Sequence, residues 1–298
     1  MAPSRLPKWG VPVLWIPVKI RAIYACLFPF TKVRLLDYLQ ITTFTHVLLF
    51  VKKIIYGLWN VWFYILAGIG VVLCFPLLLV FLQREQWYRH VFWLARWVWS
   101  PIIMYGMGFW PRFTRLQALE KGKNYMFVAN HLSMIDIMLV LMAVKNPFVF
   151  VGKRELEEIP LFNYIYRRAA ILVDRDSVQS RKNVYHRAQK KLDMGYSVCI
   201  YPEGLVPHPD VYLAPFKNGA FSLAIQYQMP IVPITLPDCK KRFPFQFGHK
   251  YWVGTPGIAR ATVHPAIETS GLTKDDLPAL KKKTYQFFSE QLRKEGYS

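Results

Sequence analysis

Acidic residues are scarce in this chain. Its 18 Asp and Glu residues stand against 38 Lys and Arg residues, which gives a formal net charge of +20 at pH 7. Soluble nucleic-acid-binding proteins share such a charge, but here 53% of the residues are hydrophobic and 16% aromatic, and no nucleic-acid-binding motif occurs. We therefore expect an anionic membrane surface as partner and no nucleic acid, because each Lys or Arg near lipid headgroups contributes about 1 kcal/mol.

Cysteine is rare as well. The four cysteines, Cys26, Cys74, Cys199 and Cys239, have neither the spacing of a metal site nor that of a disulfide framework. The amino terminus lacks the basic start, directly following apolar run and small-residue cleavage site of a signal peptide. These absences argue against a metal centre and a disulfide-stapled secreted domain, and they favour a catalytic region that faces the reducing cytoplasm.

Charge is missing altogether from Ile54 to Leu82. A bilayer core needs about 20 apolar residues, so this stretch predicts membrane insertion. Both flanks are basic, and positive residues favour the cytoplasmic side. Since glycines and Pro76 interrupt the stretch, a hairpin or re-entrant anchor with both flanks in the cytoplasm is a hypothesis beside a simple crossing.

Aromatic and basic residues alternate in the next segment, Trp87 to Trp110. This mixture is typical of a helix at the lipid interface, and a helix packed in a protein core is the alternative. We accordingly expect two parts: apolar membrane-anchoring helices over residues 1–110 and an α/β domain over residues 111–298.

The second half alternates short apolar runs with polar helical segments, a pattern that predicts an α/β fold with a mostly parallel sheet covered by helices. Strands are expected at Tyr125–Ala129, Phe148–Val151, Ala170–Val173, Ser197–Tyr201, Ile231–Leu236 and Ile258–Val263. Helices are expected at Ser133–Val144, Pro160–Arg168, Ser180–Met194 and Ala220–Gln228, and a last helix begins near Thr273 and runs with breaks to Arg293.

The most informative stretch is Asn130–Asp136, where a buried strand gives way to a helix. Ser133 followed three residues later by Asp136 is a capping-box pattern, which predicts a helix starting at Ser133 and leaves His131 in the loop before it. From there, His131 can fold back onto the first helical turn. An Asp that binds one ring nitrogen leaves the other free to take a proton, as a general base does. A capped helix preceded by a surface histidine is the equally simple alternative.

Further polar groups follow the other expected strands. Gly152-Lys153 comes after the second strand, Asp174-Arg175 after the third and Pro202-Glu203-Gly204 after the fourth. Ligands gather beyond the carboxyl ends of parallel strands, so these groups are expected to converge with His131 on a phosphate-bearing substrate. Arg175 would bind phosphate with two hydrogen bonds and Lys153 as a point charge. Taken singly, the two cations could be solvated, and Glu203 could cap a helix.

Together, four ordered blocks between residues 85 and 240 resemble the glycerolipid acyltransferase family, which includes 1-acylglycerol-3-phosphate acyltransferases. The blocks are Asn130-His131-x-Ser133-x-x-Asp136, Lys153–Pro160 with Val173-Asp174-Arg175, Tyr201-Pro202-Glu203-Gly204, and Ile231-Val232-Pro233-Ile234. The resemblance implies that His131 is the catalytic base and Asp136 its orienting acid. It also implies that the substrate is bound by Asn130, Ser133, Lys153, Arg175, Glu203 and Gly204.

That resemblance implies transfer of an acyl group from a coenzyme A or acyl carrier protein thioester, a co-substrate rather than a cofactor, to a lysophospholipid acceptor. The expected product is phosphatidic acid, made at a phospholipid membrane. Family members usually continue the third block with Thr and then Arg or Ser, whereas this chain has Leu205 and Val206. Acylation of another lysolipid headgroup and a non-catalytic membrane lipid or phosphate binder therefore stay open.

The helix start at Phe216–Ala220 is as consistent with substrate contact as with simple capping.

Overall fold

The computed structural model describes residues 35–153, 158, 162–173, 178–208, 210–245 and 253–297. Contacts divide the chain into two units, residues 1–52 and residues 53–298. The unit that holds the sheet thus begins at Lys53, and the division expected after residue 110 remains a prediction. The two units are described separately below.

A seven-stranded sheet forms the centre of the larger unit. Its strands are β1 (Phe109–Arg115), β2 (Met126–Ala129), β3 (Phe148–Lys153), β4 (Ala170–Val173), β5 (Ser197–Ile200), β6 (Ile231–Thr235) and β7 (Gly257–Val263), in the spatial order β1-β7-β6-β2-β5-β3-β4. Among the described strands, β6 and β7 pair antiparallel and the other neighbours pair parallel. The predicted mostly parallel α/β fold is confirmed.

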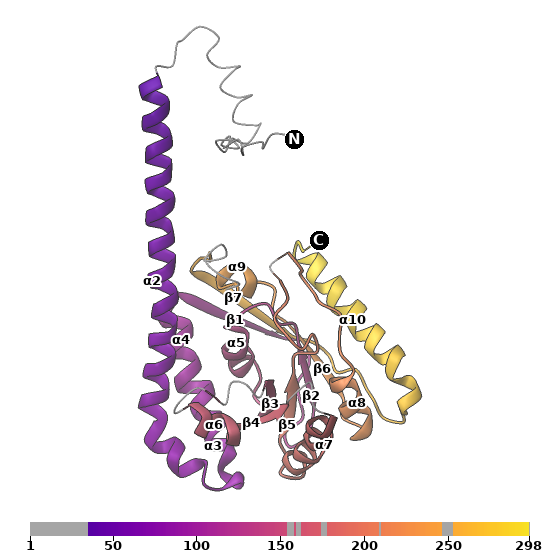
Figure 1. The fold of residues 1–298 in the computed structure, drawn as a ribbon. Helices are drawn as coiled ribbons and strands as arrows, with labels where there is room; N and C mark the ends of the chain where they lie inside the picture. Colours follow the sequence, from indigo (N-terminus) through magenta and orange to yellow (C-terminus); the bar gives the residue numbers. More distant parts are fainter. Residues whose placement is uncertain are drawn as a thin grey trace, which may run out of the picture. The chain divides into compact units, whose positions relative to one another are not determined.

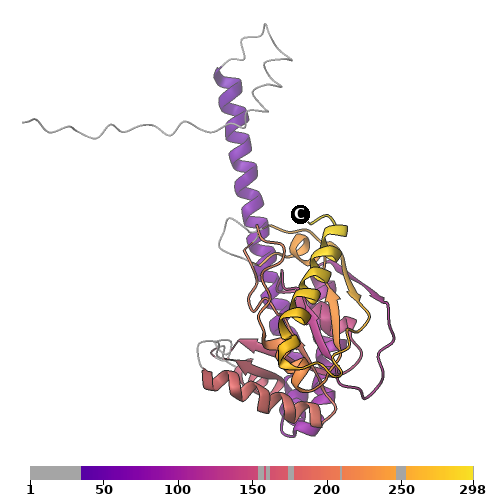
Figure 2. The ribbon, with the colours of Figure 1, turned by 90° about the vertical axis from the view of Figure 1, so that its right-hand side faces the viewer.

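Helices cover both faces of this sheet (Figure 1). On one side lie α7 (Val178–Asp193), α8 (Gly219–Gln226) and α10 (Leu277–Lys294), and Figure 2 brings α10 to the front. On the other side lie α5 (Asp136–Ala143) and α4 (Ser100–Gly106). Two further short helices are α6 (Phe162–Ala169) and α9 (Cys239–Arg242). Because β2 is covered on both faces, all four of its residues are buried, which explains its uninterrupted apolar sequence.

Helix α2 (Leu35–Phe81) contains nearly the whole charge-free stretch in one uninterrupted helix of 47 residues. The stretch therefore does not fold into a hairpin, contrary to that hypothesis, and Pro76 lies inside the helix. Within it, Phe44–Phe81 is long and apolar enough to cross a membrane, and only 28% of the most apolar window is buried. A core helix of that length would be mostly buried, so the exposure favours the predicted anchor.

The part of α2 in the larger unit packs against the sheet domain by one stripe. Phe63, Cys74 and Leu78 lie on this stripe and are buried. The indole N–H of Trp62 donates to the carbonyl of Gly106 over 3.0 Å, and that of Trp99 donates to the carbonyl of Ala67 over 3.1 Å. Apolar side chains on the other faces of the helix remain exposed.

Residues 85–106 combine both readings that their composition left open. They form η1 (Glu85–Trp87), α3 (Tyr88–Leu94), the π-helical turn η2 (Ala95–Trp99) and α4. One side is core: Arg96 is buried and donates to the carbonyl of Leu141 over 3.0 Å. On the other side, Trp93 and Trp97 are more than half exposed, as expected of aromatic side chains at a lipid interface.

Several element bounds differ from those expected. Strand β1 was not predicted, because its Pro and two Arg residues hide the apolar pattern; it is an edge strand, where such residues are tolerated. The last helix is unbroken from Leu277 to Lys294. Helix α9 was not predicted either, since four residues are too few for a periodic signal.

Candidate active site

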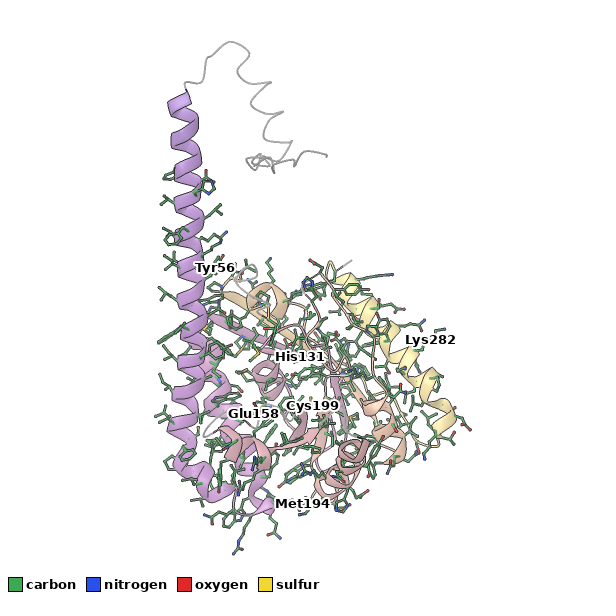
Figure 3. All side chains as sticks on the ribbon, viewed as in Figure 1. Tyr56, His131, Glu158, Met194, Cys199 and Lys282 are labelled. Atoms are coloured by element: carbon green, nitrogen blue, oxygen red, sulfur yellow. The ribbon has the colours of Figure 1, made fainter. Side chains whose placement is uncertain are left out.

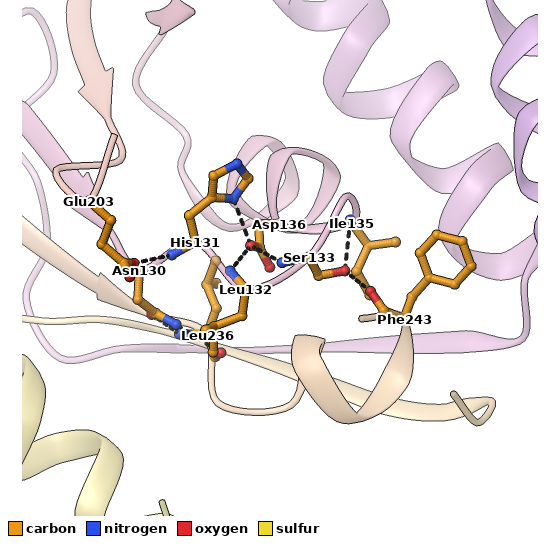
Figure 4. A network of polar contacts seen from close by, with 9 residues as sticks. All are labelled: Asn130, His131, Leu132, Ser133, Ile135, Asp136, Glu203, Leu236 and Phe243. Carbon is orange, nitrogen blue, oxygen red and sulfur yellow. Dashed lines mark hydrogen bonds and ion pairs between the residues drawn. The ribbon is translucent and has the colours of Figure 1, made fainter. Parts of the chain in front are cut away.

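The ring of His131, whose place in the fold is labelled in Figure 3, lies against the carboxylate of Asp136 at the carboxyl end of β2 (Figure 4). The distance from His131 Nδ1 to Asp136 Oδ2 is 2.9 Å. The Asp136 side chain is fully buried, whereas that of His131 is 17% exposed. An ionised carboxylate accepts a hydrogen bond from the N–H group at Nδ1, which leaves the lone pair on Nε2. Nε2 makes no hydrogen bond to any described residue. The imidazole therefore has one nitrogen bonded to Asp136 and a second nitrogen that can accept a proton.

The helix after His131 begins later than the capping-box pattern predicted. Helix α5 starts at Asp136, not at Ser133. The acid does reach back as expected, because its Oδ2 accepts the N–H groups of Leu132 (2.6 Å) and Ser133 (2.8 Å). The Ser133 hydroxyl, however, accepts from the N–H of Ile135 (3.2 Å) rather than from Asp136. A tight loop, rather than a helical first turn, therefore brings His131 and Asp136 together.

Two long-range contacts hold this loop in place (Figure 4). The Asn130 side chain is fully buried: its Oδ1 accepts from the N–H of Leu236 (2.8 Å), and its Nδ2 donates to the carbonyl of the same residue (3.3 Å). The Ser133 hydroxyl donates to the carbonyl of Phe243. These bonds position the loop from within the protein; the substrate contacts predicted for Asn130 and Ser133 remain predictions.

Glu203 joins the turn after β5 to the same loop. Its Oε1 accepts from the N–H of His131 over 2.7 Å and its Oε2 from the N–H of Ala214 over 2.8 Å. The side chain is 2% exposed. Burial raises the pKa of Glu203 to about 7, the two backbone hydrogen bonds oppose that rise, and the nearby charge of Asp136 adds to it. The Glu203 carboxylate thus binds the backbone N–H groups of His131 and Ala214. A direct contact between Glu203 and the substrate remains a prediction.

An aromatic stack packs against the ring of His131. The rings of His131 and Tyr201 are 4.1 Å apart at 17°, and the rings of Tyr201 and Phe150 are 6.0 Å apart at 10°. The stack fixes the plane of the imidazole, so Nε2 has a defined direction. No role was predicted for Tyr201, which belongs to the third motif block. Its position at the end of the expected strand Ser197–Tyr201, whose following residues were expected to converge with His131, is the sequence signal that could have assigned one.

Of the three remaining predicted residues, Lys153 and Gly204 lie at the same edge of the sheet. Lys153 is the last residue of β3, which lies beside β5; only its backbone is described. Arg175 follows β4 and lies outside the described residues. Gly204 lies in the turn after β5 with φ at +77°, a conformation that favours glycine.

The backbone N–H groups of residues 131–133 are already used. Those of His131, Leu132 and Ser133 donate to carboxylates, so none of these three is free to stabilise an oxyanion. What the arrangement offers is a buried acid, an oriented imidazole and an accessible ring nitrogen. This combination suits the removal of a proton from a hydroxyl group.

Comparisons with known proteins agree with this geometry. Residues 111–237 match the family model described as Acyltransferase. The relative acl-1 of Caenorhabditis elegans is 30% identical over 195 residues, which cover 63% of this chain and 72% of the relative. The chain belongs to the glycerolipid acyltransferase family. All four motif blocks lie within the residues that the family model matches.

Human members of the acyltransferase family are similar over a shorter share of their length. The 1-acyl-sn-glycerol-3-phosphate acyltransferase beta of Homo sapiens is 33% identical over 178 residues, 59% of this chain and 62% of the relative. The alpha protein is 34% identical over 166 residues, 53% of this chain and 55% of the relative. The chain thus spans less than two thirds of the length of each of these two human proteins.

A solved acyltransferase shares the fold. The crystal structure of the 1-acyl-sn-glycerophosphate (LPA) acyltransferase PlsC from Thermotoga maritima aligns with a TM-score of 0.63 at 23% identity, covering 81% of this chain and 97% of that one. The likeness extends over most of both chains, so the sheet and its covering helices have the architecture of an acyltransferase.

Proposed function

We propose that this chain transfers a fatty acyl group from a thioester of coenzyme A or acyl carrier protein to the free hydroxyl of 1-acylglycerol-3-phosphate, giving phosphatidic acid. The observation that carries the proposal is the 2.9 Å contact between His131 Nδ1 and the buried Asp136 carboxylate, with Nε2 available. Relatives named for this reaction support the choice of acceptor.

In the proposed step, His131 Nε2 takes the proton of the acceptor hydroxyl as its oxygen attacks the thioester carbonyl carbon. The new C–O bond forms, the C–S bond breaks, and the proton passes from the imidazolium to the departing thiolate. Asp136 stabilises the imidazolium in between. General-base assistance of this kind contributes about 10²- to 10⁴-fold. No covalent intermediate with the protein is needed, since the thioester is already activated.

The proposed enzyme acts at a membrane, and we place its active site on the cytoplasmic side. The exposed apolar faces of α2 and the exposed rings of Trp93 and Trp97 support a lipid surface as partner. A lysophospholipid partitions into the bilayer, so an anchored enzyme meets its acceptor there. The side is tested by adding protease to sealed vesicles whose cytoplasmic face is outward. Cleavage of the sheet domain is the expected result, and protection of the sheet domain would contradict a cytoplasmic active site.

The reaction is tested with the purified full chain in detergent. It is given labelled acyl-coenzyme A or acyl carrier protein thioester and a panel of lysolipids, and wild type is compared with His131→Ala. We expect labelled phosphatidic acid from wild type, and a loss of about 10²- to 10⁴-fold in the variant with membrane association unchanged. Equal rates for both proteins would reject the mechanism and leave a lipid or phosphate binder as the alternative.

A second acceptor is favoured by one observation. Leu205 follows the Glu203-Gly204 turn, is 52% exposed, and has neither the hydroxyl nor the cation that relatives usually carry after this block. Acylation of a lysolipid with a different headgroup is therefore the runner-up function. The lysolipid panel separates the two, because the identity of the labelled product gives the headgroup.

A further inference from the structure

The turn after β5 lacks a cation of its own. It runs through Glu203 and Gly204 into Leu205 and Val206, two apolar residues. The acidic side chain in this turn is buried and accepts two backbone N–H groups. A phosphate-bearing acceptor near His131 would thus meet no positive charge from residues 203–206.

A second segment folds back on this turn and brings a lysine to it. The N–H of Ala214 donates to Glu203 Oε2 over 2.8 Å, and the N–H of Lys217 donates to the carbonyl of Pro202 over 2.8 Å. Both ends of the segment Ala214–Lys217 are therefore bonded to the turn. The backbone of Lys217 has a fixed position beside residues 202–204.

The Lys217 side chain lies across Gly204. A β-carbon placed on Gly204 would be 2.8 Å from Cδ, 2.9 Å from Cε and 3.1 Å from Nζ of Lys217. The absence of a side chain at Gly204 therefore leaves room for the lysine. Its ammonium group makes no hydrogen bond or ion pair with any described residue, and the residue is exposed.

The lysine and the candidate base are connected through two consecutive residues. Glu203 accepts from the N–H of His131 at 2.7 Å, and Gly204, the next residue, contacts Lys217. We propose that Lys217 supplies the positive charge for the acceptor's phosphate group, in place of the cation missing at positions 205 and 206. This inference rests on the proposed acyl transfer. A phosphate monoester carries a charge of about −1.5 to −2 at neutral pH, and an unpaired ammonium is a suitable point charge for it.

The kinetic test uses the full chain in detergent with lysophosphatidate and monoacylglycerol as acceptors. Lys217→Ala is expected to raise KM for lysophosphatidate about 10- to 100-fold, the range of one charge-assisted hydrogen bond, with little change in kcat. Lys217→Arg should restore most of the loss, and the rate on monoacylglycerol, which has no phosphate, should not fall. Lys282→Ala removes an exposed charge on α10 and is the control for general electrostatics (Figure 3).

A matched pair of glycine variants tests the contact itself. Gly204 and Gly122 both have positive φ, +77° and +85°, but a β-carbon at Gly122 would meet nothing within 4 Å. Both Gly→Ala variants carry the same backbone strain, and only Gly204→Ala displaces the lysine. A raised KM for lysophosphatidate in Gly204→Ala alone is the expected result; equal KM values in the two variants would contradict the contact.

A binding measurement tests the role of Lys217 independently of the proposed acyl transfer. Calorimetric titration of wild type and Lys217→Ala with a short-chain, monomeric lysophosphatidate needs no turnover. Weaker binding by the variant supports the inference even if wild type acylates no lysolipid, in which case only the proposed function fails. Unchanged binding and unchanged KM overturn the inference while the acyltransferase activity stands. A wild type that neither binds nor acylates lysophosphatidate overturns both.

Discussion

The N–H of His131 donates to Oε1 of Glu203 across 72 positions of sequence. This one hydrogen bond joins the loop after β2 to the turn after β5, and the second oxygen of the same carboxylate holds Ala214. Glu203 is therefore the point where three segments of the candidate site meet. Because the carboxylate is buried, its charge state couples the stability of these segments to pH.

The stability of wild type is expected to fall as pH rises from about 4.5 to about 7. The pKa of Glu203 is raised from 4.5 to about 7 by burial, so the folded state binds this proton more tightly than the unfolded state does. The contribution of this proton to the free energy of unfolding is fully present below pH 4.5 and is lost as the pH rises to about 7. A difference of about 2.5 pKa units corresponds to on the order of 3 kcal/mol.

Glu203→Gln removes this titration and serves as the reference. Thermal unfolding of both proteins in the same detergent, from pH 4.5 to pH 7.5, measures the difference. We expect the gap between wild type and Glu203→Gln to change with pH in the stated direction. Parallel melting curves across the range would show that the group does not titrate there.

Asn130→Ala should loosen the loop that carries His131. The substitution removes two hydrogen bonds to Leu236 and leaves that residue's buried N–H and carbonyl without partners, at a cost of about 1–3 kcal/mol for each group. We expect a lower melting temperature and a lower kcat. Asn146→Ala, which removes one exposed bond to the carbonyl of Glu120, is the control and should change neither. A variant as active and stable as wild type would exclude the positioning role.

Asp136→Asn is expected to lower kcat by about 10²- to 10⁴-fold, because a neutral amide neither stabilises the imidazolium nor fixes the tautomer. The chain provides its own control in His208 and Asp210, whose Nδ1 and Oδ2 lie 3.0 Å apart on the surface. Asp210→Asn should leave kcat unchanged. Similar losses in both variants would indicate a general effect of removing an acid.

Leu73→Lys tests the anchor. Leu73 is exposed on α2 in the candidate membrane span, and a lysine at the centre of a membrane helix costs about 2.5–3.5 kcal/mol. Resistance to alkaline carbonate extraction from membranes should fall. Leu116→Lys, a comparably exposed leucine after β1, is the control. Retention of Leu73→Lys in the membrane pellet would argue against a lipid-facing position.

The local sequence predicted the strands well because their buried runs are nearly continuous. Ala170–Val173 was placed to the residue, β2 and β5 differ from the predicted bounds by one residue at one end, and β3 ends two residues later than predicted. The start of α5 was missed by three residues, because a capping box and the observed loop share the pattern Ser133-x-x-Asp136. Which N–H groups the serine and the acid bind decides between them, and the sequence does not carry that information.

The partners of the loop could not be predicted. Leu236 and Phe243 reach the loop only through the order of strands in the sheet, and both bind through main-chain atoms that any residue has. Lys217 lies in the segment Phe216–Ala220, for which substrate contact and simple capping were equally consistent with the sequence, and its approach to Gly204 was not predicted. A role for Tyr201 could have been predicted, since it ends a strand whose following residues were expected to converge with His131. The predicted convergence of the strand ends is present for β2, β3, β4 and β5, which lie side by side in parallel.

The bonds from Asn130 to Leu236 and from Ser133 to Phe243 close loops of 106 and 110 residues. When the ribosome has just completed the seven-residue motif, neither of these two partners has been synthesised. The loop that carries His131 gains these two anchoring bonds only after the residues that follow β6 and α9 emerge, so a nascent fragment contains the motif without the long-range contacts that hold it in place.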